Sequence, residues 1–210
     1  MDKTLYFPMG LNIKNRFCLV IGNDFEAFEK AERLASFGAK VTIVAEVIPE
    51  EKLSHLKQKG IQFFLRAFDP SDLDGKFLVF LCLSHVELTE KIVRLCSEKN
   101  ILLCAIDQPE YCDIVNQSIF QKGFLTISVA TNGVAPTVAK KIREGLELSL
   151  CEEPIEEFLE DLKLLRDELL NSISDPKERR KKLIAAAENV VFKAQIQLPT
   201  WWLEKKKDKK

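Results

Sequence analysis

Short apolar runs alternate with amphipathic stretches through the first half of the chain. In the amphipathic stretches apolar residues recur at helical spacing, as at Ala27, Ala31 and Leu34, and Gly38 stands where that helix would end. This order of elements predicts a parallel sheet wound by right-handed crossovers, the α/β class. The apolar runs predict five buried strands, at residues 18–21, 41–44, 61–65, 77–83 and 101–106.

The first strand–helix–strand unit has the length of the first half of a dinucleotide-binding fold. Its strand ends at Gly22, Asn23-Asp24 supply turn and N-cap chemistry, and Glu46 follows the second strand, where it could accept hydrogen bonds from a ribose. The G-x-G-x-x-G/A fingerprint requires a small residue at position 24, and a carboxylate there repels a pyrophosphate unless it turns away. Two interpretations stay open: a dinucleotide site, or a strand end in another kind of α/β domain.

The pattern changes after residue 112. Short strands at 114–115, 118–120 and 124–130 precede a turn at 131–133 and a helix that begins at Pro136. Beyond residue 151 the apolar positions follow helical spacing. We therefore predict a Rossmann-like domain at 1–112, a small α+β domain at 113–150 and a helical domain at 151–210, with a short edge strand within 5–15.

Composition and charge argue against a nucleic-acid-binding, secreted, membrane or metal-binding protein. The 210 residues carry 31 Lys and Arg against 32 Asp and Glu, a balance that argues against nucleic acid as a partner. The opening residues do not resemble a secretory signal and the apolar runs are too short to cross a bilayer, so we expect a cytoplasmic protein without membrane contact. Six cysteines without a C-x-x-C pair and two distant histidines predict buried reduced thiols and no metal site.

Candidate chemistry lies at the ends of the predicted strands, because ligands bind beyond the carboxyl ends of a parallel sheet. Three such ends carry polar residues, at 22–25, 83–85 and 106–108. Asp107 is the acid at the third end, where a carboxylate could move a proton. The structural alternative for Asp107 is a turn or helix cap.

Four stretches of the chain resemble the precorrin-2 dehydrogenase / sirohydrochlorin ferrochelatase family, the N-terminal module of siroheme synthase. They are YFPMGLNIKNRFCLVIG at 6–22, Lys30-Ala31, DLDGKFLVF at 72–80 and the block at 104–144. Within that block, residues 104–109, 117–119 and 130–136 correspond to the family's N-V-V-D-x-P, P-A-I or P-S-I, and S-T-G-G-x-S-P motifs.

The resemblance implies a specific activity. Members of the family bind NAD⁺ in the first domain, form homodimers through the second, and with the helical domain build a cleft for a tetrapyrrole with eight carboxylates. They oxidise precorrin-2 to sirohydrochlorin in siroheme or cobalamin synthesis. Bifunctional members then insert Fe²⁺ to give siroheme.

The resemblance also implies roles for individual residues. The family's catalytic aspartate, a general base, corresponds to Asp107. The turn near the substrate corresponds to Thr131, Asn132 and Gly133. The NAD⁺ contacts correspond to Gly22, Asn23, Asp24, Phe25, Glu26, Glu46, Val47, Ser84 and His85.

Two cofactor loops depart from the family pattern. The family's G-G-G is Gly22-Asn23-Asp24 here, and its A-T-D-D is Cys82-Leu83-Ser84-His85. Three hypotheses therefore remain. The chain is an NAD-dependent precorrin-2 dehydrogenase, a sirohydrochlorin chelatase with weak or lost NAD⁺ binding, or a tetrapyrrole-binding protein without catalysis.

Overall fold

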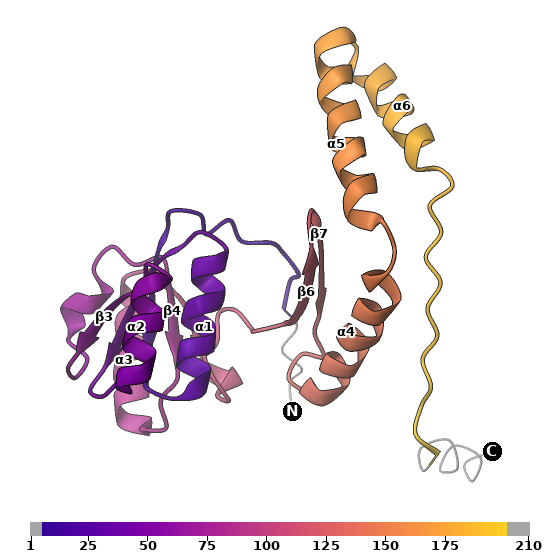
Figure 1. Ribbon diagram of the computed structural model, residues 1–210. Coiled ribbons are helices and arrows are strands. Elements are labelled where there is room, and N and C mark those ends of the chain that lie inside the picture. Colours follow the sequence, from indigo (N-terminus) through magenta and orange to yellow (C-terminus); the bar gives the residue numbers. More distant parts are fainter. Residues whose placement is uncertain (1–5, 201–210) are drawn as a thin grey trace. The chain divides into compact units, whose positions relative to one another are not determined.

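A computed structural model describes residues 6–200 and divides the chain into two compact units, Met1–Asn116 and Gln117–Lys210 (Figure 1). The first unit is a sheet covered by helices, and the second is a β-hairpin with three helices. None of the described helices is long and apolar enough to span a bilayer.

The first unit contains the predicted parallel sheet, with five strands in the order β3-β2-β1-β4-β5. The strands are β1 (Phe17–Ile21), β2 (Lys40–Ala45), β3 (Gln62–Leu65), β4 (Leu78–Leu81) and β5 (Leu102–Ala105). From β1 the chain winds outward through β2 and β3 and then returns to place β4 on the other side of β1. The carboxyl ends of β1 and β4 therefore form the topological switch point, where such folds bind ligands.

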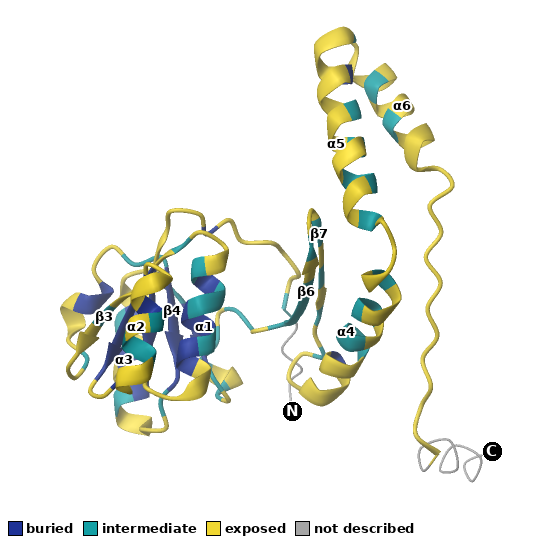
Figure 2. Ribbon diagram, viewed as in Figure 1, coloured by how far each residue is buried: buried dark blue, intermediate teal, exposed yellow. Residues whose placement is uncertain are grey.

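Helices cover both faces of the sheet, which explains why β1 and β4 are apolar at every position. Along β1, Cys18 and Val20 pack on the side of α1 (Phe25–Ser36) and α2 (Glu50–Gln58). Leu19 and Ile21 pack on the opposite side, with α3 (Val86–Glu98). Figure 2 shows these strands in dark blue, the buried core of the unit.

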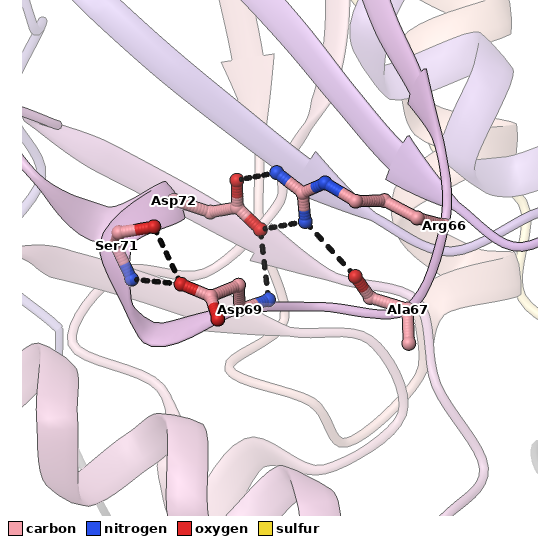
Figure 3. Close-up of polar contacts among 5 residues, drawn as sticks. All are labelled: Arg66, Ala67, Asp69, Ser71 and Asp72. Carbon is pink, nitrogen blue, oxygen red and sulfur yellow. Dashed lines mark hydrogen bonds and ion pairs between the residues drawn. The ribbon is translucent and has the colours of Figure 1, made fainter.

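A polar network closes the turn after β3. The Arg66 guanidinium donates to both carboxylate oxygens of the buried Asp72, at 2.8 and 2.5 Å, and the Asp69 backbone N–H donates to the same carboxylate at 2.9 Å (Figure 3). The Asp69 side chain in turn accepts from the Ser71 backbone N–H at the start of the 3₁₀ helix η1 (Pro70–Leu73). This network holds the crossover that leads into β4.

The second unit begins with an antiparallel hairpin of β6 (Ser118–Lys122) and β7 (Leu125–Val129). Gly123, with φ of +54°, is the first of its two turn residues, a position that favours glycine. α4 (Pro136–Cys151) packs on the hairpin, and α5 (Ile155–Ser172) pairs with α6 (Pro176–Ala187). Among residues 117–200, only Ala139 and Leu169 are buried apolar residues (Figure 2).

Three sequence predictions are wrong in detail. Residues 6–15 form no strand, because their apolar side chains are exposed or isolated apart from Ile13. Residues 114–115 form no strand either; the Asp113 and Ile114 N–H groups donate to the Leu103 carbonyl, which covers the free edge of β5 without extending the sheet. The helical region does not continue through 190–199, where the chain forms neither helix nor strand, as an alternating pattern ending at Pro199 favours; residues 201–210 of the predicted helical domain lie outside the described residues.

Candidate functional site

The three predicted loops meet at the carboxyl edge of the sheet in the first unit. Gly22, at the end of β1, has φ of +147°, and a Cβ added there would lie 2.4 Å from the Cys82 carbonyl oxygen. The loop after β4 is tied to the loop after β5, because the Gln108 side-chain amide donates to the Leu83 carbonyl at 3.1 Å. Close approach of the backbone therefore requires glycine at position 22. Gln108 joins the other two loops, a role that no pattern in the sequence indicates.

The Asp24 carboxylate lies at the N-terminus of α1. It accepts a hydrogen bond of 2.7 Å from the Ala27 backbone N–H and so acts as the helix N-cap. A helix N-terminus at this turn is where a dinucleotide places its pyrophosphate. Asp24 thus does not turn away from the phosphate position, and an anion arriving there would compete with the carboxylate.

The remaining predicted cofactor residues lie along the same edge of the sheet. Asn23, Phe25 and Glu26 are exposed around the start of α1, and Glu46 and Val47 are exposed just beyond β2. Ser84 and His85 are exposed after β4. The His85 Nδ1 accepts from the Leu88 backbone N–H at 3.2 Å and caps α3, so both helices that begin at the switch point are capped by their own side chains.

The electrostatic environment of the switch point is negative. Burial, with a smaller contribution from the nearby Asp24 and Glu26 carboxylates, raises the pKa of the Cys82 thiol to about 12, and Lys30 opposes this shift. These carboxylates disfavour additional negative charge near the end of β1. The thiol itself is protonated at neutral pH and inert as a nucleophile.

Asp107 is exposed directly after β5, in a left-handed conformation with φ of +58°. Aspartate tolerates this conformation better than most residues. Within residues 6–200 its carboxylate makes no hydrogen bond and no ion pair, and the following 3₁₀ helix η2 (Pro109–Tyr111) has Gln108 at its N-cap. Asp107 is therefore not a cap, which leaves its carboxylate available to accept a proton.

Two thiols, Cys104 in β5 and Cys112 after it, lie next to the loop that carries Asp107. The Cys112 Sγ donates to the Ala105 carbonyl and accepts from the Ala105 N–H, each at 3.2 Å. A hydrogen bond between the Cys104 and Cys112 side chains raises the pKa of Cys104 and lowers that of Cys112. All six cysteines are free thiols, as predicted, although Cys112 is half-buried and Cys151 is exposed. The sequence pattern gave no indication of the role of Cys112, because it lies outside any periodic element.

The turn at Thr131, Asn132 and Gly133 lies in the second unit. The Thr131 Oγ1 accepts from the Ala135 N–H at 3.1 Å, which fixes the turn at the start of α4. Asn132 and Gly133 are left-handed, with φ of +49° and +77°, and exposed. The turn is thus ordered by its own hydrogen bonds, while its contact with a substrate stays a prediction.

The backbone at the switch point is compatible with a bound nicotinamide dinucleotide, but one side chain there is unfavourable for it. Gly22 allows the close turn, the fully buried Ala27 allows close packing of α1 on the sheet, and Glu46 offers a ribose acceptor. Asp24 is the disagreement. As for metals, no group of three or more His, Cys, Asp or Glu in the described part of the chain could hold an ion.

Comparison with known proteins gives a consistent result. The family described as "Putative NAD(P)-binding" matches residues 9–118. The chain is 29% identical over 142 residues to siroheme synthase of Thioalkalivibrio sulfidiphilus, covering 68% of this chain and 29% of that protein. It is 30% identical over 145 residues to siroheme synthase of Vesicomyosocius okutanii, covering 69% and 31%. The chain thus spans about a third of the length of these curated relatives.

A solved structure supports the fold. "SirC, precorrin-2 dehydrogenase" aligns with 88% of this chain and 100% of its own, with a TM-score of 0.65 and 20% sequence identity. The likeness at that identity concerns the fold alone. The family match over residues 9–118 and the similarity to siroheme synthases show that the chain belongs to the precorrin-2 dehydrogenase / siroheme synthase N-terminal family.

Proposed function

We propose that this protein oxidises precorrin-2 to sirohydrochlorin in siroheme or cobalamin synthesis, with NAD⁺ as the acceptor. The observation that carries the proposal is Asp107, an unpaired carboxylate next to the switch point of a dinucleotide-binding sheet. A carboxylate without a structural partner is suited to proton transfer. Family membership supplies the substrate class.

Each loop at the carboxyl edge of the sheet has a proposed role in the reaction. The backbone after Gly22 and the Glu46 carboxylate would hold the dinucleotide, which when bound supplies the hydride acceptor. Asp107 would take the proton that leaves the tetrapyrrole as the hydride departs to the dinucleotide, so that the substrate loses two electrons and two protons in all. Gln108, through its bond to Leu83, would keep the Asp107 loop in register with the loop after β4.

The test is anaerobic turnover of precorrin-2 with NAD⁺, followed by NADH formation, in the native protein and in Asp107→Asn. Asparagine adopts the left-handed conformation as readily as aspartate, so the variant removes the base without straining the loop. We expect kcat to fall by about 10²–10⁴-fold, the usual contribution of a general base. Equal turnover by both proteins would contradict the role of Asp107.

A second candidate function is chelation by a protein that binds NAD⁺ weakly, and the Asp24 cap is the observation that favours it. In this case the native protein forms no NADH but inserts Fe²⁺, a substrate, into supplied sirohydrochlorin, with Asp107 accepting pyrrole protons. Binding of sirohydrochlorin without either reaction would instead indicate a carrier.

We also propose that the protein is a homodimer that associates through its second unit. Because this unit buries few apolar residues, it gains little stability from its own core. Sedimentation equilibrium over a range of concentrations should give twice the chain mass, and a single-chain mass at micromolar concentration would contradict the proposal. The large apolar side chains it leaves exposed are Phe124, Val134, Val138, Leu148, Leu164, Leu170, Ile184, Val190, Val191, Phe192, Ile196 and Leu198.

A further inference from the structure

The extended stretch after α6 has the pattern of a strand but no strand partner. All residues from 188 to 200 are exposed, and Figure 1 shows them as a plain trace without helix or arrow. Their side chains nevertheless alternate with a period of two, which is typical of a half-buried strand and foreign to a helix. Apolar residues stand at Val190, Phe192, Ala194, Ile196 and Leu198, and polar residues at Lys193, Gln195 and Gln197; Val191 is the one position in 190–198 that departs from the alternation.

The β6–β7 hairpin offers two open edges. Among residues 6–200, no third strand pairs with either strand. Lys122 and Leu125 flank the two-residue turn and form its closing pair, so backbone groups of alternate residues point away from the partner strand. By this alternation the outward N–H groups are those of Ile119 and Gln121 on β6 and of Thr126 and Ser128 on β7. Unpaired edges of this kind attract further strands.

The β6–β7 hairpin has one shielded apolar face and one exposed polar face, and the side chains of residues 190–198 divide in the same way. Leu125, Ile127 and Val129 are partly shielded, and α4 packs on the hairpin, whereas Thr126 and Ser128 are exposed. A strand added to either edge would continue this division. Its even-numbered apolar side chains would extend the shielded face, and Lys193, Gln195 and Gln197 would lie beside polar neighbours.

We propose that residues 190–198 add as a third strand to the β6–β7 hairpin of a second copy of this chain, with the exchange made reciprocally. Two observations favour a second copy. A single chain leaves both the segment and the edges unpaired, and it leaves apolar side chains of α4, α5 and α6 exposed that one strand could not cover. Reciprocal strand exchange is an isologous contact of the kind that closes a dimer. The inference rests on the self-association proposed above.

Hydrogen exchange in the full-length protein tests the strand. We compare the native protein with Phe192→Asp/Ile196→Asp, which charges the apolar positions, and with Gln195→Asp/Gln197→Asp, a control that adds the same charge at polar positions. The N–H groups of one edge, Ile119 with Gln121 or Thr126 with Ser128, should exchange at least about tenfold more slowly in the native protein and the control than in the apolar-position variant. Fast exchange on both edges, or equal exchange in the two variants, would overturn the proposal.

Isotope mixing tests whether the strand comes from a second copy. Native ¹⁵N-labelled and unlabelled chains are refolded together and treated with an amine cross-linker, and the Lys193–Lys122 cross-link is analysed by mass. Cross-linked peptide pairs that join a labelled to an unlabelled peptide are expected. If every cross-linked pair carries a single isotope, the segment lies on the hairpin of its own chain and the proposal is overturned. If the protein has the mass of a dimer but hydrogen exchange does not differ between the two variants, the added strand is refuted and the dimer is not. If the protein has the mass of a single chain, both are refuted.

Discussion

At the scale of single residues, the candidate site contains a carboxylate without a hydrogen-bond partner among the described residues and two side chains that cap helices. Asp107 is exposed in a left-handed turn and has no hydrogen-bond or ion-pair partner among residues 6–200, whereas Asp24 and His85 are helix caps. The sequence identified all three positions. The predicted N-cap chemistry at Asp24 is confirmed, whereas the sequence could not tell whether the Asp107 carboxylate is a cap or free, because only its hydrogen-bond partners decide this.

Thr89 provides a prediction at this scale. Its side chain is fully buried in α3, and its hydroxyl is the one buried side-chain polar atom without a hydrogen-bond partner among the described residues. Valine has nearly the same shape and no hydroxyl to leave unsatisfied. Thr89→Val should therefore raise the free energy of unfolding by about 1 kcal/mol, measured by urea denaturation. A loss of stability would mean that the hydroxyl is satisfied in solution, with Thr89→Ser as the control that keeps it.

At the scale of elements, the apolar runs specified the five strands because strands covered on both faces require apolar residues throughout. The strand that was wrongly predicted at 114–115 is instead a segment held by contacts between distant residues. Asp113 and Ile114 pair with Leu103 across the sheet edge, a relation that local periodicity cannot contain. The stretch after α6 was misassigned because its alternating pattern follows directly on a helix.

The turn between β3 and η1 should make the protein sensitive to acid. Its bond to Arg66 lowers the pKa of the Asp72 carboxyl, so the stabilisation is complete above the unfolded pKa of about 3.9 and is lost as pH falls through the lower folded value. Asp72→Asn should cost about 1 kcal/mol at pH 7 and reduce the loss of stability below pH 4. Denaturation curves at pH 7 and pH 3 would show this. A parallel pH dependence in the variant would assign the acid sensitivity to other carboxyls.

At the scale of the whole molecule, the first unit has a well-covered core and the second does not. The sequence predicted the change of pattern near residue 113, and the structure divides the chain between Asn116 and Gln117. Exposure of apolar surface in the second unit cannot be predicted from the sequence, because α4 and α5 have the amphipathic spacing of ordinary helices. A separate domain beyond residue 150 and the dimer remain predictions.

The most direct test of the proposed cofactor site is a calorimetric titration of NAD⁺ into the native protein and into Asp24→Asn. Asparagine caps a helix as well as aspartate does, so the variant removes the charge and keeps the cap. We predict that both proteins bind NAD⁺ and that the variant binds on the order of tenfold more tightly, since one like charge near the pyrophosphate is gone. Absence of binding to both folded proteins would contradict a dinucleotide site at the Gly22 turn.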